Sequence, residues 1–349
     1  MDIAIIGACG TVGRQLALQI LSERLLSNSA RLQLIGNQGG ASEREIHGLH
    51  ADLLDAFVDD APKIEVGLRP SDVDADIVIM LAGATVPLDL SVPVDRSRLG
   101  EINRRLFSTY ATELAKRDVP PLVLIGSNPI EAGVRIFADA LGRRRVLGIG
   151  SINDSLRFRR ELARTLGLQR TAVNALMLGE HGSHLVPIWS QVSAWGISAD
   201  QLQEQIARLR HGRRLADFPA EIDEHKTRAL KLVAAGSVVE ALEQIQALPP
   251  DLRSAVKPFF IHFTAGRTTE MSTAHASTEL LKAFLRGERR VIGAQVALMG
   301  EWQGRHGVLG VQVLLEPNGW SSVVNMELAD DETSALLASA EAIASRDCD

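Results

Sequence analysis

A glycine-rich turn near the start of the chain is the first segment whose residue types could do chemistry. It reads Gly7, Ala8, Cys9, Gly10, Thr11, Val12, Gly13 and follows directly on the apolar run Ile3–Ile6. Glycines between a strand and a helix allow a tight turn and let a pyrophosphate reach the unpaired backbone N–H groups of the helix. The turn therefore favours a dinucleotide site over a plain tight turn. Cys9 has no His or second Cys near it in sequence, which favours a small filler over a nucleophile.

A second segment places a histidine among glycines, in Gly179, Glu180, His181, Gly182. The ordinary pKa of histidine, about 6.5, suits proton exchange at neutral pH. Earlier in the chain Asp154 and Arg157 are three residues apart, so on a helix they share one face. Taken alone, most histidines are surface or fully hydrogen-bonded residues, and most Asp–Arg pairs are surface ion pairs. The flanking glycines and the order of these residues favour a functional role for His181.

The elements that must position these residues repeat one unit over residues 1–150. Amphipathic helical stretches alternate with short apolar runs, which are Ile3–Ile6, Leu32–Ile35, Ile77–Leu81, Leu122–Ile125 and Val146–Ile149. Continuous apolar strands separated by helices are typical of a parallel sheet covered on both faces. Residues 1–150 are therefore predicted to form an N-terminal Rossmann domain, an α/β fold with a doubly wound parallel sheet.

The pattern changes after residue 150. Long helical stretches are predicted at Ser155–Leu166, Ala199–His211, Glu221–Gln246 and Thr273–Leu285, followed by a β-like stretch at Val291–Leu315 and a last helix at Asp331–Ser345. Asn318-Gly319 predicts a hairpin between Val311–Leu315 and Ser321–Met326. Pro249-Pro250 and Pro258 are expected to break helices. Residues 151–349 are predicted to be a C-terminal α+β catalytic domain packed directly against the first.

Charge and composition exclude several classes of function. The 349 residues include 37 Lys+Arg and 43 Asp+Glu, a net charge of −6, which gives no long-range attraction to nucleic acid or an anionic membrane. No stretch approaches the ~18–20 apolar residues that span a bilayer, and no signal-peptide pattern is present. The two cysteines, Cys9 and Cys348, do not support a disulfide framework or a cysteine metal site. We expect a cytoplasmic protein with no metal and with no nucleic-acid or membrane partner.

Four motifs, in order, make the sequence resemble the NAD(P)-dependent lactate/malate dehydrogenase family. They are GACGTVG (7–13), LIGSNPI (124–130), NDSLRFR (153–159) and LGEHGSH (178–184), and a further match covers residues 290–320. The resemblance extends over nearly the whole chain. It implies an oxidoreductase that transfers hydride between NAD or NADP and an L-2-hydroxy acid or 2-keto acid, and it implies a homodimer or homotetramer.

The resemblance assigns a role to each candidate residue. Besides hydride, reduction of a 2-keto acid needs a proton donor, a cation for the carboxylate and polarisation of the carbonyl. By resemblance His181 is the acid/base, Asp154 orients its ring, and Arg157 pairs with the substrate carboxylate. Asn128 is implied to contact substrate and nicotinamide. The other cofactor contacts are expected from the glycine turn and from Gly36, Asn37, Ala82, Gly83 and Asn103.

One segment departs from the family pattern. In the family, an arginine that polarises the carbonyl lies seven residues before an asparagine that starts the next helix. Asn103 fits that asparagine, which implies Arg96, with Arg98 as the competitor. A malate enzyme adds a second arginine six residues earlier to hold the distal carboxylate, and here that position is Leu90.

The missing arginine affects the expected substrate. An unpaired buried carboxylate is unfavourable, so oxaloacetate is expected to be a poor substrate. Leu88, Leu90 and Val92 favour pyruvate or a 2-keto acid with a longer apolar tail. The opposing wall of the pocket is expected from Thr268–Ser272.

A second departure concerns the adenosine ribose. The second apolar run ends at Gly36-Asn37, where a carboxylate for the ribose hydroxyls is expected. Its absence removes the repulsion that excludes a 2′-phosphate. NADP, with Asn37, Ser42 or Arg44 as phosphate contacts, and NAD, held by backbone groups and Asn37, both remain open.

Two other functions compete with the dehydrogenase. A catalytically silent dinucleotide-binding or sensing protein of the same fold would bind cofactor without turnover, and the unusual loop and missing ribose acid favour it. The intact set of His181, Asp154 and Arg157 favours turnover instead. An NAD-dependent glycosidase of related architecture is disfavoured, because Ser127 rather than a metal-binding cysteine precedes Asn128.

Overall fold

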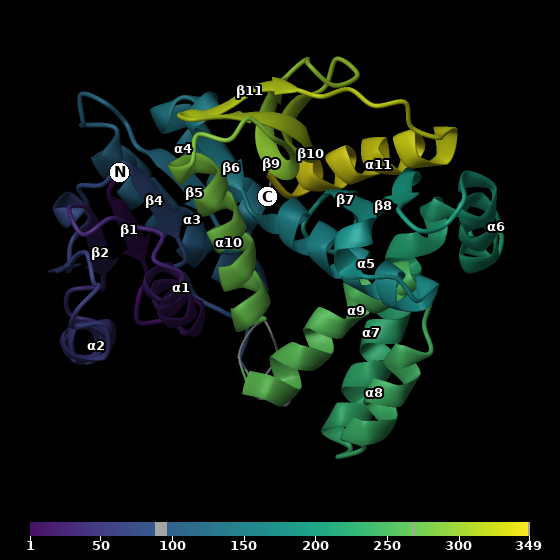
Figure 1. Ribbon diagram of the computed structural model, residues 1–349, viewed down its shortest axis with the longest axis horizontal. Coiled ribbons are helices and arrows are strands. Elements are labelled where there is room, and N and C mark those ends of the chain that lie inside the picture. Colours follow the sequence, from purple (N-terminus) through teal and green to yellow (C-terminus); the bar gives the residue numbers. More distant parts are fainter. Residues whose placement is uncertain (88–95, 267–268, 348–349) are drawn as a thin grey trace.

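The computed structural model describes residues 1–87, 96–266 and 269–347 (Figure 1). Within them one sheet of eleven strands has the order β3-β2-β1-β4-β5-β6-β9-β10-β7-β8, and β11 pairs with β10. The strands are β1 (Ile3–Ile6), β2 (Arg31–Ile35), β3 (Lys63–Gly67), β4 (Ile77–Met80), β5 (Leu122–Ile125), β6 (Val146–Gly148), β7 (Val173–Gly179), β8 (Leu185–Ala194), β9 (Val291–Met299), β10 (His306–Glu316) and β11 (Gly319–Val323). The helices are α1 (Thr11–Ser22), α2 (Ser42–Ala56), α3 (Arg96–Leu114), α4 (Ile130–Leu141), α5 (Gly150–Leu166), α6 (Ala199–Arg210), α7 (Phe218–Ala234), α8 (Val238–Gln246), α9 (Pro250–Ile261), α10 (Glu270–Leu285) and α11 (Asp330–Asp347).

The first six strands are all parallel, and helices cover both of their faces. Alternate side chains of β1 point to opposite faces. Ile3 and Ile5 belong to the core formed with α1 and α2, whereas Ala4 and Ile6 belong to the core formed with α3 and α4. The predicted doubly wound sheet is therefore confirmed. Sequence reasoning did not identify β3, whose middle residues are only partly buried.

The sheet continues without interruption into the second half of the chain. Strand β9 lies antiparallel beside β6, with Gly148 opposite Gln295, and β10, β7, β8 and β11 add further antiparallel pairs. Figure 1 shows α5 and α11 beside this part of the sheet and α7, α8 and α9 grouped beyond it. Strand β6 ends at Gly148 and α5 begins at Gly150, so the division predicted after residue 150 falls at the first residue of α5.

Several predicted elements have different limits in the structure. The single helix expected at Glu221–Gln246 is two helices, α7 and α8, because Gly236 adopts a left-handed conformation between them (φ +83°). Pro250 is the first residue of α9 and Pro258 lies inside it, so neither proline ends a helix there. The β-like stretch at 291–315 is two strands, β9 and β10. The Asn318-Gly319 hairpin is confirmed by the β10–β11 pair, although β11 already begins at Gly319.

None of the described helices has both the length and the apolar composition needed to cross a membrane.

Candidate active site

Helix α5 and the end of β7 bring three predicted residues into one hydrogen-bonded chain. His181 Nδ1 lies 2.6 Å from Asp154 Oδ2, and Arg157 Nη1 donates to Asp154 Oδ1 at 2.8 Å. The side chains of Asp154, Arg157 and His181 are only 10%, 12% and 20% exposed, so all three charges are largely removed from water. Because Asp154 occupies Nδ1, the other ring nitrogen, Nε2, is left to exchange a proton with a ligand.

The charges of Asp154, Arg157 and His181 shift the pKa values of the histidine and the aspartate. Burial by itself lowers the pKa of His181, but the Asp154 carboxylate outweighs burial and raises it above its usual value. Burial by itself raises the pKa of Asp154, but His181 and Arg157 outweigh it and lower that pKa. The arrangement therefore keeps Asp154 ionised and favours the protonated form of His181.

The outer side of Arg157 faces the start of α10. Its Nη2 donates to Thr269 Oγ1 at 2.7 Å and to Ser272 Oγ at 3.3 Å. Thr269 precedes the first residue of the helix, and its side chain does not cap it. Residues 269 and 272 of the predicted wall thus contact Arg157, whereas Thr268 lies outside the described residues.

A buried carboxylate that sequence reasoning missed supports His181 from the opposite side. Glu131, in the first turn of α4, accepts the backbone N–H of His181 at 2.7 Å. Burial raises the pKa of Glu131. The signal available in the sequence was its place directly after the Asn128-Pro129-Ile130 segment, where an acidic residue begins a helix.

Glu180, which precedes His181, links the site to the last helix. It is 4% exposed, accepts from His184 Nδ1 at 3.0 Å and pairs with Arg346 on α11. The Arg346 carbonyl in turn accepts from Arg104 on α3 at 2.9 Å. Burial alone would raise the pKa of Glu180, but His184 and Arg346 lower it. Residues almost 250 positions apart in the chain are therefore connected through the neighbour of His181.

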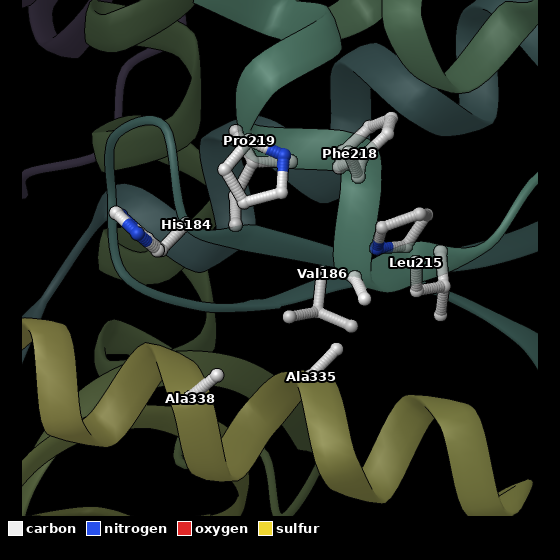
Figure 2. Close-up of a pocket in the computed structure, with 10 residues that line it drawn as sticks. His184, Val186, Leu215, Phe218, Pro219, Ala335 and Ala338 are labelled. Carbon is white, nitrogen blue, oxygen red and sulfur yellow. The ribbon is translucent and has the colours of Figure 1, made fainter.

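A small apolar cavity lies behind this connection rather than at the site. Figure 2 shows His184 at its edge, with Val186, Phe218 and Pro219 on one side and Ala335 and Ala338 of α11 on the other. Its volume is about 40 Å³, which admits a few water molecules at most, since one needs about 10–15 Å³ on this measure. The cavity lies between α7, β8 and α11, and none of Asp154, Arg157 and His181 lines it.

The glycine turn forms a cradle that fits a dinucleotide pyrophosphate. Gly7 has a φ of +88°, and a Cβ added there would lie 2.6 Å from the backbone nitrogen of Ala82. A Cβ on Gly13 would lie 2.3 Å from the carbonyl oxygen of Gly7. Gly10 caps α1 with no side-chain hydrogen bond, so its first N–H groups stay available to an anion.

Four of the other predicted cofactor contacts converge at the ends of β4 and β5. Asn103 Oδ1 accepts the N–H of Ala84 at 2.7 Å, and its Nδ2 donates to the carbonyl of Asn128 at 2.7 Å. A Cβ on Gly83 would lie 3.0 Å from Asn103 Oδ1, and the hydroxyl of Ser127 donates to the carbonyl of Ala82 at 2.7 Å. Asn103 is 2% exposed, so it ties these loops together rather than facing solvent.

The segment after β2 carries the remaining predicted contacts. Gly36 is buried, whereas Asn37 is exposed and its N–H bonds to Ser42 Oγ at 2.9 Å. Ser42 begins α2, which has Glu43 and Glu45 in its first turn. The thiol of Cys9 points to the Ser42 carbonyl, at 3.8 Å, and burial raises its pKa, which fits a filler rather than a nucleophile.

The predicted arrangement around Arg96 is corrected in one respect. Asn103 does not start a helix: α3 begins at Arg96, and Asn103 lies two turns inside it. Arg96 and Asn103, seven residues apart, therefore lie in the same helix. Asn103 holds two loops by hydrogen bonds to Ala84 and Asn128, and these contacts do not require it to be the first residue of a helix. The side chain of Arg96 and residues 88–95, with Leu88, Leu90 and Val92, lie outside the described residues.

The geometry so far defines a Rossmann-fold protein with a cradle for a dinucleotide and a buried acid/base cluster beside the carboxyl ends of its parallel strands. Comparison with protein families is consistent with this class. The lactate/malate dehydrogenase NAD-binding domain matches residues 1–148, and the alpha/beta C-terminal domain of the same family matches residues 261–346. Asp154, Arg157 and His181 lie between the two matched ranges.

Individual relatives match over nearly their whole length. A malate dehydrogenase of Methanothermobacter thermautotrophicus is 28% identical over 96% of this chain and 93% of the relative. An L-2-hydroxycarboxylate dehydrogenase (NAD(P)(+)) of Methanocaldococcus jannaschii is 27% identical over 98% and 97%. A Cryptosporidium parvum lactate dehydrogenase, solved with lactic acid and β-nicotinamide adenine dinucleotide, shares the fold with a TM-score of 0.76 at 20% identity, over 99% of this chain and 96% of that one.

The chain belongs to the lactate/malate dehydrogenase family. It is a hydroxy acid dehydrogenase that uses NAD or NADP. The silent-binder alternative receives no support from these relatives, which are named as dehydrogenases.

Proposed function

We propose that this enzyme interconverts an L-2-hydroxy monocarboxylic acid and its 2-keto acid, with His181 as the acid/base and Arg157 as the carboxylate-binding residue. The observation that carries the proposal is the unbroken hydrogen-bonded chain from Thr269 through Arg157 and Asp154 to His181. In this arrangement the proposed proton donor, His181, and the residue proposed to bind the substrate carboxylate, Arg157, both bond to the same side chain, Asp154.

The chain's own residues divide the work of the reaction. Bound NADH or NADPH supplies the hydride. His181 holds at Nε2 the proton that the carbonyl oxygen receives, and Asp154 stabilises the imidazolium that carries it. The guanidinium of Arg157 has five N–H donors, and its contacts to Asp154, Thr269 and Ser272 leave part of it for a substrate carboxylate. Arg96, as the first residue of α3, is our candidate for polarising the carbonyl, and Asn128 for contacting substrate and nicotinamide.

The proposal of a monocarboxylate depends on the lack of an arginine at Leu90 or its neighbours. The names of the relatives include malate, lactate and L-2-hydroxycarboxylate dehydrogenases, so they support a family of 2-hydroxy acids rather than one member. A charge-assisted hydrogen bond contributes about 1.5–3 kcal/mol, and without a second one oxaloacetate should lose about 10- to 100-fold in kcat/KM.

For the cofactor we propose that both NADH and NADPH are used. No acidic side chain follows β2 directly, and a Cβ on Gly36 would lie 3.1 Å from Ile46 Cδ1, so a larger residue there would require Ile46 to shift. Ser42 and Arg44 at the start of α2 are the candidates for a 2′-phosphate. We also propose a cytoplasmic homodimer or homotetramer, on the family resemblance.

Initial rates test these proposals directly. Oxaloacetate, pyruvate and 2-ketoisocaproate would each be assayed with NADH and with NADPH near pH 7. A monocarboxylate should be the best substrate. A preference of about tenfold or more for oxaloacetate would mean that a cation outside the described residues holds the distal carboxylate. No turnover of any keto acid would contradict the roles given to His181 and Arg157.

A further inference from the structure

Asn153, the neighbour of Asp154 on α5, carries a buried polar atom with no protein partner. The residue is 3% exposed, and its Nδ2 donates to Thr273 Oγ1 at 3.3 Å. Its Oδ1 has no hydrogen-bond partner among the described residues. Leaving a buried amide oxygen unsatisfied is unfavourable, so such an atom calls for an explanation.

The position of Asn153 relates it directly to Arg157. The two residues are four apart on α5 and so share a face of that helix. They contact successive turns of α10: Arg157 binds Thr269, and Asn153 binds Thr273. Thr269 Oγ1 and Thr273 Oγ1 lie 3.2 Å apart and close the ring of contacts. One helical turn is about 5.4 Å, so the orphan oxygen lies within the reach of a small acid held at Arg157.

Two other buried nitrogens without a hydrogen bond in the described part of the chain, Arg253 Nε and Arg213 Nε, lie within ion pairs. Arg253 Nε faces Glu161 at 3.0 Å within an ion-paired cluster, and Arg213 binds Asp251 through Nη2 and Glu221 through Nη1. Asn153 Oδ1 is distinguished by its place beside the charged chain of Asp154, Arg157 and His181. A ligand bound at that chain can therefore satisfy it.

The chemistry of the amide selects the group that would bind. An amide oxygen accepts hydrogen bonds, so a carboxylate would be repelled and a methyl group would leave the oxygen unsatisfied. A hydroxyl can donate to Oδ1 of Asn153. If the amide is turned by 180° so that Nδ2 takes the place of Oδ1, the hydroxyl can accept from Nδ2 instead.

We propose that Asn153, held by Thr273, forms a subsite for a hydroxyl group on the tail of the substrate, so that the enzyme prefers hydroxylated 2-keto monocarboxylic acids. This inference rests on the proposed function, because it takes the substrate carboxylate to lie at Arg157. It adds a specificity-determining residue to that function.

A matched pair of substrates measures the preference. 3-Hydroxypyruvate and 2-oxobutyrate differ by a hydroxyl in place of a methyl group and have nearly the same size. The ratio of their kcat/KM values would be determined for the wild type and for Asn153→Leu. Because the two acids differ in intrinsic reactivity, the change of the ratio between enzymes is the readout. We expect Asn153→Leu to lower it by about tenfold or more.

Two further variants separate recognition from packing. Thr273→Val removes the partner that holds the amide and should lower the same ratio by a smaller factor, about three- to fivefold. Thr278→Val removes a buried hydroxyl of α10 that faces Gln19 on α1, and it should leave the ratio unchanged. If Asn153→Leu does not fold, as shown by its melting curve, Asn153→Ala replaces it, since a cavity would not by itself favour the methyl group.

The outcomes are distinct. An unchanged ratio in the Asn153 and Thr273 variants overturns the inference while leaving the proposed function intact. A raised KM for NADH with an unchanged ratio also overturns it, since the orphan oxygen would then serve the cofactor. Turnover of pyruvate without turnover of 3-hydroxypyruvate is a third contrary result. If the wild type reduces no 2-keto acid at all, the proposed function itself fails.

Discussion

Helix α5 carries two buried charge clusters, and the contrast between them shows what distinguishes a site from a structural network. The first is the active-site cluster of Asp154, Arg157 and His181. The second, which we call the α9 cluster, is Glu161 with Arg160, Arg253 and Lys257. Glu161 is completely buried and faces three cations, two of them on α9.

The two clusters differ in what they leave unpaired. In the α9 cluster every charged group is turned toward the single carboxylate, so the charges stabilise the contact between α5 and α9. In the active-site cluster Asp154 is shared by an arginine and a histidine, and no described residue bonds His181 Nε2. A hydrogen-bond network in which one donor has no protein partner can bind a ligand. A network in which every charged group has a protein partner serves to stabilise the fold.

The largest effect is expected at the open end of the active-site cluster. His181→Ala should lower kcat by about 10³-fold or more, because the proton donor is lost, while the Kd for NADH stays within about twofold. Stopped-flow turnover and NADH fluorescence titration measure the two quantities. His184→Ala, which removes a ring bound to Glu180, serves as the control and should cost less than about tenfold. Equal losses of kcat in the two variants would show that the loss comes from disturbing this region of the structure and not from removing a proton donor at His181.

Arg157→Lys should lower kcat/KM by about 100-fold, mostly through KM, because a lysine cannot make the paired contacts of a guanidinium. Steady-state kinetics with pyruvate measure it. The same exchange in the α9 cluster, Arg253→Lys, is the matched control and should leave kcat/KM within about threefold. If both exchanges changed KM alike, the distinction between the clusters would be lost.

Asp154→Asn should move the pH profile. In the wild type the Asp154 carboxylate raises the pKa of His181, so the reduction rate falls, and the oxidation rate rises, as pH increases through that raised pKa. Without the Asp154 carboxylate, burial and the charge of Arg157 outweigh the remaining carboxylate, Glu131, and lower the pKa of His181. The falling limb of reduction should then move to lower pH, which lowers the reduction rate near pH 7 by about tenfold. Profiles of kcat/KM in both directions test this; an unmoved limb would mean that another group titrates.

The smallest effect on activity is expected in the α9 cluster. Glu161→Gln leaves three cations facing a neutral group and should lower the free energy of unfolding by about 3–5 kcal/mol. The kcat/KM should stay within about twofold. Urea denaturation and steady-state kinetics separate the two. A large loss of activity in a folded Glu161→Gln enzyme would show that the α9 cluster also supports catalysis, which would contradict the distinction between the two clusters.

The sequence predicted most of the parallel half of the fold because its signals are local. Apolar runs such as Ile3–Ile6 and the glycine turn after them each determine a short element without reference to distant residues. The prediction of a single helix at 221–246 was wrong, because Gly236 separates two helices there. A single glycine within a helical pattern gives only a weak local signal.

The candidate site was only partly predictable. Its charged members stand in recognisable motifs, and the structure brings Asp154, Arg157 and His181 together. The groups that support them lie outside these motifs, although Glu131 directly follows one of them. Glu131 and Arg346 reach His181 and Glu180 across 50 and 166 residues of chain. Such contacts are set by how helices pack on the sheet, and no local periodicity encodes them.

The junction between β6 and β9 determines how the molecule can respond to its ligands. Gln295 on β9 is fully buried there, and its side chain accepts from the N–H of Ser151 and donates to the hydroxyl of Ser151, both at 3.0 Å. A hinge between the two halves would have to pull this pair apart and separate two neighbouring strands. The contacts described at this junction therefore oppose a hinge between the two halves. We expect amide hydrogens of β6 and β9 to exchange equally slowly with and without cofactor.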